Sequence, residues 1–406
     1  MTQPRLLTKP LHQYFVITGN YWAFTLTDGA LRMLVVLHFH NLGYSPLAIA
    51  MLFLFYEIFG IITNLVGGWL GARFGLNRTM NMGLGLQILA LAMLLVPDAQ
   101  LTVIWVMAAQ ALSGIAKDLN KMSAKSAIKT LVPVGATGKL YKWVAVLTGS
   151  KNALKGVGFF IGGALLALVG FQSAAGLMMA SLALVFLLSI IFLTNDIGKA
   201  RAKPRFTDIF SKSAPVNYLS AARMFLFGSR DVWFVVALPV FLASTLGWSQ
   251  ASIGSFFAIW IIGYGFIQSL TPVITGRRSG RLPDGLTAFY WATGLAAIPI
   301  FLGFMINNST DVETILLIGL MVFGALFAIN SAVHSFLIVD YAARDSASLD
   351  VGFYYMANAA GRLLGTVLSG WVFQIWGLAA CLWISGIFLL ITAAISLGLP
   401  KRTHPS

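Results

Sequence analysis

Charged residues are scarce in this chain of 406 residues, because Asp, Glu, Lys and Arg together make up only 10% of it. Soluble domains carry about 25% charged residues. The rest of the chain is strongly apolar, with 58% hydrophobic residues and a mean hydropathy of +0.84. These proportions exclude an ordinary soluble protein and predict an all-α chain that crosses the lipid bilayer many times.

Cysteine and acidic residues are also rare. The single cysteine, Cys381, lies in an apolar run, which excludes a disulfide framework and a cysteine-based metal site. Lys and Arg outnumber Asp and Glu by 27 to 13, but they form no basic face alternating with aromatics, so nucleic-acid binding is not indicated. The chain has no HExxH zinc motif and no Gly-rich ATP loop. We therefore expect no metal, no cofactor and no enzymatic activity.

Apolar stretches of bilayer-spanning length predict about twelve transmembrane helices. Their expected ranges are 12–41, 46–72, 78–96, 101–130, 139–169, 174–194, 218–245, 250–275, 285–306, 313–340, 349–375 and 377–398. Lys and Arg gather in the loops of one side, whereas the loops of the other side carry none. Since positive loops face the cytoplasm, we expect a multi-pass protein of the inner (cytoplasmic) membrane with both termini in the cytoplasm.

A basic segment after the sixth span predicts two six-helix bundles, residues 1–195 and 218–406, joined by a cytoplasmic linker, residues 196–217. Within it, residues 206–212 form either a short amphipathic helix on the membrane surface or a solvated connection. A short internal repeat supports the division, because LGYS at residues 42–45 matches LGWS at residues 246–249. Each copy lies between the first and second spans of its half, as expected for pseudo-symmetric bundles.

Charges inside the predicted spans are the main functional indication, because each costs on the order of 3 kcal/mol at a helix centre on insertion scales. The cations are Arg32, Lys117, Lys121, Lys151, Lys155, Arg230 and Arg362. The acids are Asp28, Glu57, Asp118 and Asp231. Seven cations against four acids leave an excess of three positive charges. An interior of this kind favours a multiply charged anion, whose oxygens Arg can bind through two parallel hydrogen bonds.

Each charged residue has two open interpretations. A cation either contacts the substrate or forms an ion pair between helices. An acid either pairs with a cation, as expected for Asp28 with Arg32 and for Asp231 with Arg230, or carries a proton. Glu57 is the favoured proton carrier, because its own helix has no cation nearby. Three neutral polar residues could complete a substrate site. They are Asn152, Tyr354 and Asn358.

The span count, the internal repeat and the loop after the second span resemble the major facilitator superfamily. In that loop Gly68, Arg73, Gly75 and Arg78 fit the family pattern, whereas Ala72 replaces its acid and Leu76 one of its basic residues. The resemblance implies two bundles that rock about a central site, with this loop helping to gate it. It also implies that spans one, four, seven and ten line the cavity, with spans two, five, eight and eleven beside them. All the charged residues above lie on these spans.

A narrower resemblance covers residues 21–32, 38–40, 114–119 and 148–156, which are similar to ArsJ-type organoarsenical efflux permeases. That family is held to export 1-arseno-3-phosphoglycerate, which a glyceraldehyde-3-phosphate dehydrogenase makes when it uses arsenate in place of phosphate. The resemblance implies an exporter of this anion that confers arsenate resistance and works beside such a dehydrogenase. Because export against a gradient needs an energy source, the buried acids indicate exchange of the substrate for protons. The alternatives are an organophosphate or phosphate exchanger of the same fold, and a membrane receptor that transports nothing.

Overall fold

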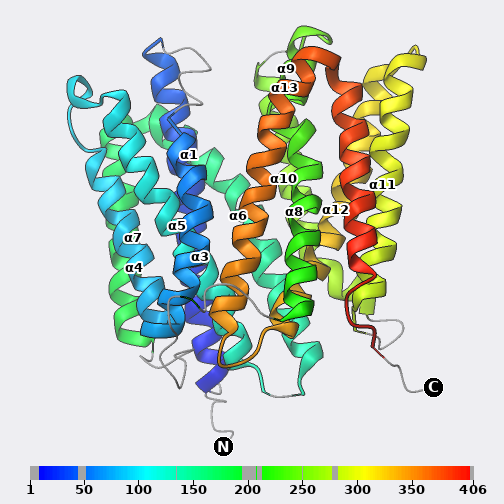
Figure 1. The fold of residues 1–406 in the computed structure, drawn as a ribbon. Helices are drawn as coiled ribbons and strands as arrows, with labels where there is room; N and C mark the ends of the chain where they lie inside the picture. Colours follow the sequence, from blue (N-terminus) through cyan, green and yellow to red (C-terminus); the bar gives the residue numbers. More distant parts are fainter. Residues whose placement is uncertain are drawn as a thin grey trace, which may run out of the picture. The chain divides into compact units, whose positions relative to one another are not determined.

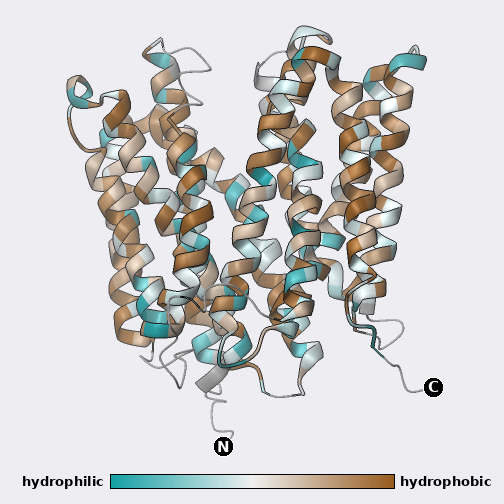
Figure 2. Cartoon of the chain, in the orientation of Figure 1, coloured by the Kyte–Doolittle hydropathy of each residue, from teal (hydrophilic) through white to brown (hydrophobic). Residues whose placement is uncertain are grey.

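The structure is a computed structural model, and it describes residues 9–43, 52–133, 135–193, 207, 213–248, 250–276 and 282–402. These residues form α-helices joined by short turns, with no β-strand in the described part (Figure 1). The all-α fold class is therefore confirmed. Hydrophobic residues dominate the helices, and hydrophilic residues interrupt them at their ends and at points along their length (Figure 2).

The chain forms two compact units. Unit 1 comprises Met1–Trp143, Leu154–Phe210 and Ala342–Gly352, and unit 2 comprises Val144–Ala153, Ser211–Tyr341 and Phe353–Ser406. The predicted linker, residues 196–217, lies mostly outside the described residues. The linker, the possible amphipathic helix at residues 206–212 and the bundle boundaries therefore stay predictions.

Unit 1 is built around α5, which packs against α1, α3 and α4, while α7 packs against α1 and α4. Its helices are α1 (Lys9–Asn41), α3 (Leu54–Phe74), α4 (Leu76–Met93), the short 3-10 helix η1 (Asp98–Gln100), α5 (Val103–Leu131), α7 (Phe171–Phe192) and most of α6 (Thr137–Val169). The core of unit 1 consists of buried aliphatic and aromatic side chains such as Phe24, Leu84 and Val106.

Unit 2 is built around α12, which packs against α8, α10 and α11. Its helices are α8 (Ala214–Phe234), α9 (Ala237–Ser244), α10 (Gln250–Gly276), α11 (Gly285–Asn308), α12 (Val312–Tyr341) and α13 (Ala347–Ser396), whose first residues belong to unit 1. Its core is rich in aromatics, including Trp233 and Phe323, whose rings meet edge to face with centroids 5.1 Å apart.

The predicted spans and the described helices correspond closely. The last two spans are a single helix, α13, interrupted at Gly377, where φ is 73° and the backbone is not helical. The predicted span 218–245 is instead two helices, because the backbone leaves helical geometry at Val236. There the Ser369 hydroxyl accepts hydrogen bonds from the N–H groups of Val236 and Ala237, which stabilises the break. Eight of the described helices, with α8 and α9 taken together, are long and apolar enough to cross a membrane, and α1, α4 and α5 are not among them.

Glycines bring helix backbones into contact at several places, and two of these contacts join the helices that carry the charges. A Cβ atom on Gly162 of α6 would collide with the carbonyl oxygen of Ala30 on α1. A Cβ atom on Gly361 of α13 would collide with the carbonyl oxygen of Met224 on α8. Small residues of this kind let membrane helices approach closely. They fix the pairs α1–α6 and α8–α13, which carry most of the charged residues discussed below.

Candidate functional site

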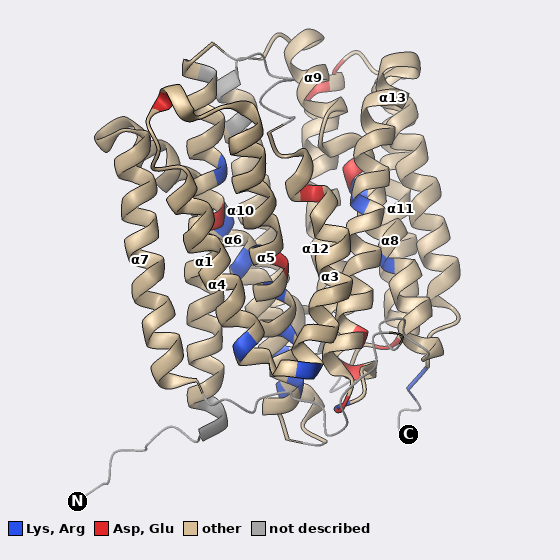
Figure 3. Ribbon diagram, turned by 60° about the vertical axis from the view of Figure 1, so that its left-hand side comes forward, with Lys and Arg blue, Asp and Glu red and all other residues tan. Residues whose placement is uncertain are grey.

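Charged residues lie part-way along the helices as well as at their ends (Figure 3). They form one cluster in each unit. The unit 1 cluster contains Asp28, Arg32, Tyr56, Glu57, Lys117, Asp118, Lys121 and Lys155. The unit 2 cluster contains Arg223, Arg230, Asp231, Ser331, Asn358 and Arg362. All are predicted site residues except Tyr56, Arg223 and Ser331.

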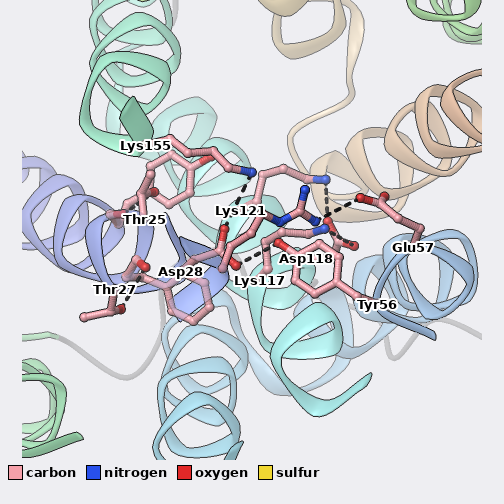
Figure 4. Close-up of polar contacts among 12 residues, drawn as sticks. Thr25, Thr27, Asp28, Tyr56, Glu57, Lys117, Asp118, Lys121 and Lys155 are labelled. Carbon is pink, nitrogen blue, oxygen red and sulfur yellow. Dashed lines mark hydrogen bonds and ion pairs between the residues drawn. The ribbon is translucent and has the colours of Figure 1, made fainter. Parts of the chain in front are cut away.

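Asp118 is the most deeply buried carboxylate of the unit 1 cluster, with 2% of its side chain exposed. Lys121 lies 2.6 Å from its Oδ1 atom, and Lys117 lies 3.9 Å from its Oδ2 atom (Figure 4). All three residues lie on α5, so the run KDLNK at residues 117–121 supplies both cations and the carboxylate that holds them. The arrangement leaves one more cation than acid.

Asp28 is held by two helices other than its own. Its Oδ1 atom accepts a 2.7 Å hydrogen bond from the Tyr56 hydroxyl of α3, and its Oδ2 atom lies 3.9 Å from Nζ of Lys155 on α6 (Figure 4). The expected pair with Arg32, one turn away on α1, is not formed. The spacing of four residues places Asp28 and Arg32 on one face of α1. Which residue pairs with Asp28 depends on the helices that pack against that face, α3 and α6.

Arg32 pairs with Glu57 at 3.3 Å. The prediction for Glu57 considered only its own helix, which has no cation nearby, whereas its partner here comes from α1. Its role as a proton carrier stays a prediction. Both side chains remain accessible, with 29% of Arg32 and 34% of Glu57 exposed. Glu57 is therefore the most exposed of the four predicted acids.

Tyr56 connects the two halves of this cluster. The Arg32 guanidinium lies 4.8 Å from the centre of its ring, and Nζ of Lys117 lies 3.7 Å from it. Cations at these distances are attracted by the face of an aromatic ring. The Tyr56 hydroxyl meanwhile donates to Asp28, so this one side chain contacts two cations and one anion. Sequence reasoning missed it, although a tyrosine directly before Glu57 in an apolar span was a visible signal.

The unit 1 cluster has four cations and three carboxylates, which leaves one positive charge in excess. Exposure is distributed unevenly within it. Asp118 and Asp28 expose 2% and 7% of their side chains, whereas Lys155 exposes 23% and Arg32 29%. The two buried carboxylates thus hold cations that are more exposed than they are, while Glu57, at 34%, is the one exposed carboxylate of the cluster.

Asp231 organises the unit 2 cluster. Its carboxylate, 1% exposed, accepts a 2.6 Å hydrogen bond from Nε of the neighbouring Arg230 and a 3.1 Å hydrogen bond from Nε of Arg362 on α13. The expected pair with Arg230 is therefore present. Two arginines share one carboxylate, and 34% of the Arg362 side chain is exposed.

Arg223 is a further cation of unit 2, which sequence reasoning missed. It is 3% exposed, and no carboxylate lies within ion-pair distance of it in the described part of the chain. The predicted span began at residue 218, which put Arg223 near the membrane edge. Helix α8 begins at Ala214, so Arg223 lies almost midway along it. A usable signal was its spacing of seven residues from Arg230, which places both on one helix face.

The neutral polar residues also lie in unit 2. Asn152 donates a 2.6 Å hydrogen bond to Gln268, and Gln268 donates to the hydroxyl of Ser331. Asn358 accepts a hydrogen bond from Arg223, and the Tyr354 ring lies 5.2 Å from the Arg223 guanidinium. Lys151 lies on α6 in the same unit, partly exposed.

The predicted gating loop contains a tight turn and an apolar contact. Gly75 joins α3 to α4 with φ of 95°, a conformation that favours glycine, and Arg73 stacks over Trp69 at 5.1 Å. A Cβ atom on Gly68 would lie 2.5 Å from the carbonyl oxygen of Ser348. Ala72, which replaces the family's acid, is buried against Leu349. An apolar contact therefore stands where the family pattern has a charge. The gating role of the four loop residues, among them Arg78, stays a prediction.

Comparisons with known proteins place this geometry in context. The sequence profile described as the Major Facilitator Superfamily matches residues 14–236 and 219–406. A search of curated proteins found no match. Among solved structures, the human organic anion transporter MFSD10 (TETRAN) has a TM-score of 0.76 at 14% identity, covering 97% of this chain and 100% of its own.

Two further solved structures have the same fold. The proton:xylose symporter XylE has a TM-score of 0.69 at 15% identity and covers 94% of both chains. The E. coli fucose:proton symporter FucP has a TM-score of 0.71 at 12% identity and covers 95% of this chain and 98% of its own. At these identities the likeness shows the fold alone. No comparison bears on the ArsJ-type resemblance.

Proposed function

Because this chain belongs to the Major Facilitator Superfamily, it is a secondary transporter rather than an enzyme, and we propose that it exports a multiply charged organic anion by alternating access. The observation that carries this proposal is the positive excess of both clusters. Unit 1 has four cations for three carboxylates, and unit 2 has three arginines for one carboxylate.

The chemistry of the cations suits an oxyanion. Arg362 donates to Asp231 through Nε, and 34% of its side chain is exposed, so we expect a phosphate or arsenate oxygen to reach it. Arg32 is similarly accessible and faces Glu57 at 3.3 Å. A sugar carries no charge that would need such an excess. The name of one structural relative, an organic anion transporter, agrees with this interpretation, but the proposal rests on the charges.

Within this class, we propose 1-arseno-3-phosphoglycerate as the substrate and arsenate resistance as the consequence. The support is the resemblance to ArsJ-type permeases, whose matching runs contain five members of the unit 1 cluster. These are Asp28, Arg32, Lys117, Asp118 and Lys155. A glyceraldehyde-3-phosphate dehydrogenase would supply this substrate in the cytoplasm. The positive loops support an inner-membrane location with cytoplasmic termini.

Proton exchange is the proposed energy source, with Glu57, Asp28, Asp118 and Asp231 as candidate carriers. Glu57 is the first choice, because it is the most exposed of them and it pairs with an arginine that is itself accessible, Arg32. In vesicles, Glu57→Gln should remove the dependence of transport on an imposed pH gradient while leaving exchange down a substrate gradient. Retained pH-gradient dependence would assign the coupling to another group.

The substrate is tested in two steps. Cells producing this protein together with the dehydrogenase should grow on arsenate, whereas Arg32→Gln should lose resistance. Arg402→Gln is the matched control, because Arg402 pairs with Asp340 outside both clusters. In everted vesicles, the arsenate adduct should be taken up and should compete with 3-phosphoglycerate.

A second candidate is an organophosphate or phosphate exchanger, which the same cations favour equally. Uptake of 3-phosphoglycerate that the arsenate adduct does not inhibit, in cells that gain no resistance, would select this alternative. No uptake of any phosphorylated or arsenylated anion would reject both. A receptor that transports nothing is disfavoured, because the chain belongs to a family of transporters.

A further inference from the structure

Arg223 is a buried cation held entirely by neutral groups. Its Nε atom donates to Asn358 at 2.9 Å, and its Nη1 atom donates to the carbonyl oxygen and the hydroxyl of Ser331 at 3.2 and 3.1 Å. The guanidinium also lies 3.9 Å from the centre of the Phe227 ring. Burying an unneutralised charge costs several kcal/mol. These contacts orient the group without neutralising it.

Polar side chains without hydrogen-bond partners lie on the helix that faces Arg223. Asn330 and His334 are both 0% exposed, and neither side chain has a hydrogen-bond partner among the described residues. They lie one turn apart on α12, and His334 follows Ser331 by three residues, which places it on the same helix face as the hydroxyl that contacts Arg223. Buried polar groups are almost always paired, so unpaired groups on the helix that contacts an unneutralised cation indicate a binding site.

We propose that Arg223, with Asn330 and His334, forms an oxyanion-binding subsite in unit 2, which accepts a phosphate, arsenate or carboxylate group of the transported anion. This proposal rests on the proposed function and adds residues to it that lie outside the Arg230–Asp231–Arg362 group. Nη2 of Arg223 makes no hydrogen bond to the described residues and is the donor left for the ligand. The Asn330 amide and the His334 ring can donate to the remaining oxygens.

The burial of Arg223 determines when an anion can reach the subsite. Arg223 is 3% exposed, so an anion reaches it only when the helices around it rearrange, as alternating access requires. A bound oxyanion would supply the missing negative charge and would use the unpaired donors. Without a bound oxyanion, the buried Arg223 charge and the unpaired donors destabilise the protein, and binding of the ligand removes this destabilisation. The subsite should therefore be recognised by binding that improves stability, which a purely structural arginine would not show.

The test uses the purified full chain in nanodiscs, with inorganic phosphate and 3-phosphoglycerate as probes and calorimetry as the readout. Loss of a hydrogen bond to a charged group is worth about a 10- to 100-fold change in affinity, so Arg223→Gln should weaken phosphate binding by that factor. Arg223→Lys, which keeps the charge, should retain part of it. Arg402→Gln, whose partner is Asp340, should bind as the wild type does.

Asn330→Leu separates binding from folding. Replacing an unpaired buried amide by an apolar group of similar size should leave the melting temperature unchanged or higher, while phosphate binding weakens. Phosphate binding that requires Arg223, in a protein that does not transport 3-phosphoglycerate, would support the subsite while refuting the proposed substrate class. Wild-type affinity in folded Arg223→Gln or Asn330→Leu protein, or no binding of either probe by the wild type, would overturn the subsite.

Discussion

Replacing Asp231 by asparagine should destabilise unit 2 more than any other single change of a carboxylate to an amide. Asp231 is 1% exposed and lies between two arginines, with the Nε atoms of Arg230 and Arg362 at 2.6 and 3.1 Å from its carboxylate oxygens. An asparagine side chain would keep the shape of the aspartate but leave two guanidinium groups facing each other without a negative charge. Asparagine has one acceptor oxygen where aspartate has two, so it cannot accept the hydrogen bonds of both arginines in the same way.

The magnitude follows from the burial. At an effective dielectric constant of about 20, a contact at ~3 Å is worth roughly 5 kcal/mol before desolvation is counted. The Arg362 contact is discounted, because 34% of that side chain is exposed. The Arg230 contact is not, since its side chain is only 16% exposed. Removing one partner of a buried pair costs about 3–5 kcal/mol, and we expect Asp231→Asn to fall in this range.

Unfolding in increasing SDS, followed by circular dichroism, measures this change. Asp345→Asn is the matched control, because Asp345 is exposed, and it should lie within about 0.5 kcal/mol of the wild type. Adding Arg362→Gln to Asp231→Asn should recover part of the loss by removing one of the two facing cations. If Asp231→Asn unfolds at the same SDS concentration as the control, the ion-pair reasoning is wrong.

Three further changes have expected outcomes. Gly162→Ala should destabilise the protein by forcing α1 away from α6. Gly163→Ala is the control and should be neutral, because its new Cβ would meet its nearest neighbour at 3.6 Å. Equal melting temperatures of the two variants would contradict this packing. Tyr56→Phe should cost about 1.5–3 kcal/mol in SDS unfolding, because Asp28 loses its 2.7 Å hydrogen bond. Ser369→Ala should cost about 1–3 kcal/mol in the same assay, since two backbone N–H groups at the break between α8 and α9 lose their acceptor; wild-type stability would show that the break needs no side chain.

The sequence predicted the helices well, because bilayer-spanning length and apolar composition are local properties of the chain. Even the boundary at Gly377, inside one continuous apolar region, was found. The break at Val236 was not, since its stabilising hydroxyl, on Ser369, comes from a helix 133 residues further along the chain. A property that depends on a distant partner leaves no pattern in the segment itself.

The candidate site was predicted at the level of residues but only partly at the level of partners. Helical spacing predicted which charged residues share a helix face, such as Asp28 and Arg32. It could not say that Asp28 would be held by Tyr56 and Lys155, and Arg32 by Glu57, because those contacts depend on how α1, α3 and α6 pack. For the same reason, sequence alone could not reveal that the cations are more exposed than the buried acids. Exposure is a property of the packed unit.

In both units, glycine contacts between helices lie next to the charged clusters, so the close approach of these helices also positions the charges. In unit 1, a Cβ atom on Gly29, next to Asp28, would lie 2.7 Å from the carbonyl oxygen of Lys155. In unit 2, a Cβ atom on Gly365 would lie 3.0 Å from Cβ of Asp231. Side-chain ion pairs across two helices require a short backbone separation, and glycine provides it at the level of the charges. Close helix contacts at glycine therefore lie where the carboxylates hold their cations, so a larger residue there should displace the charges and lower transport before it unfolds the bundle.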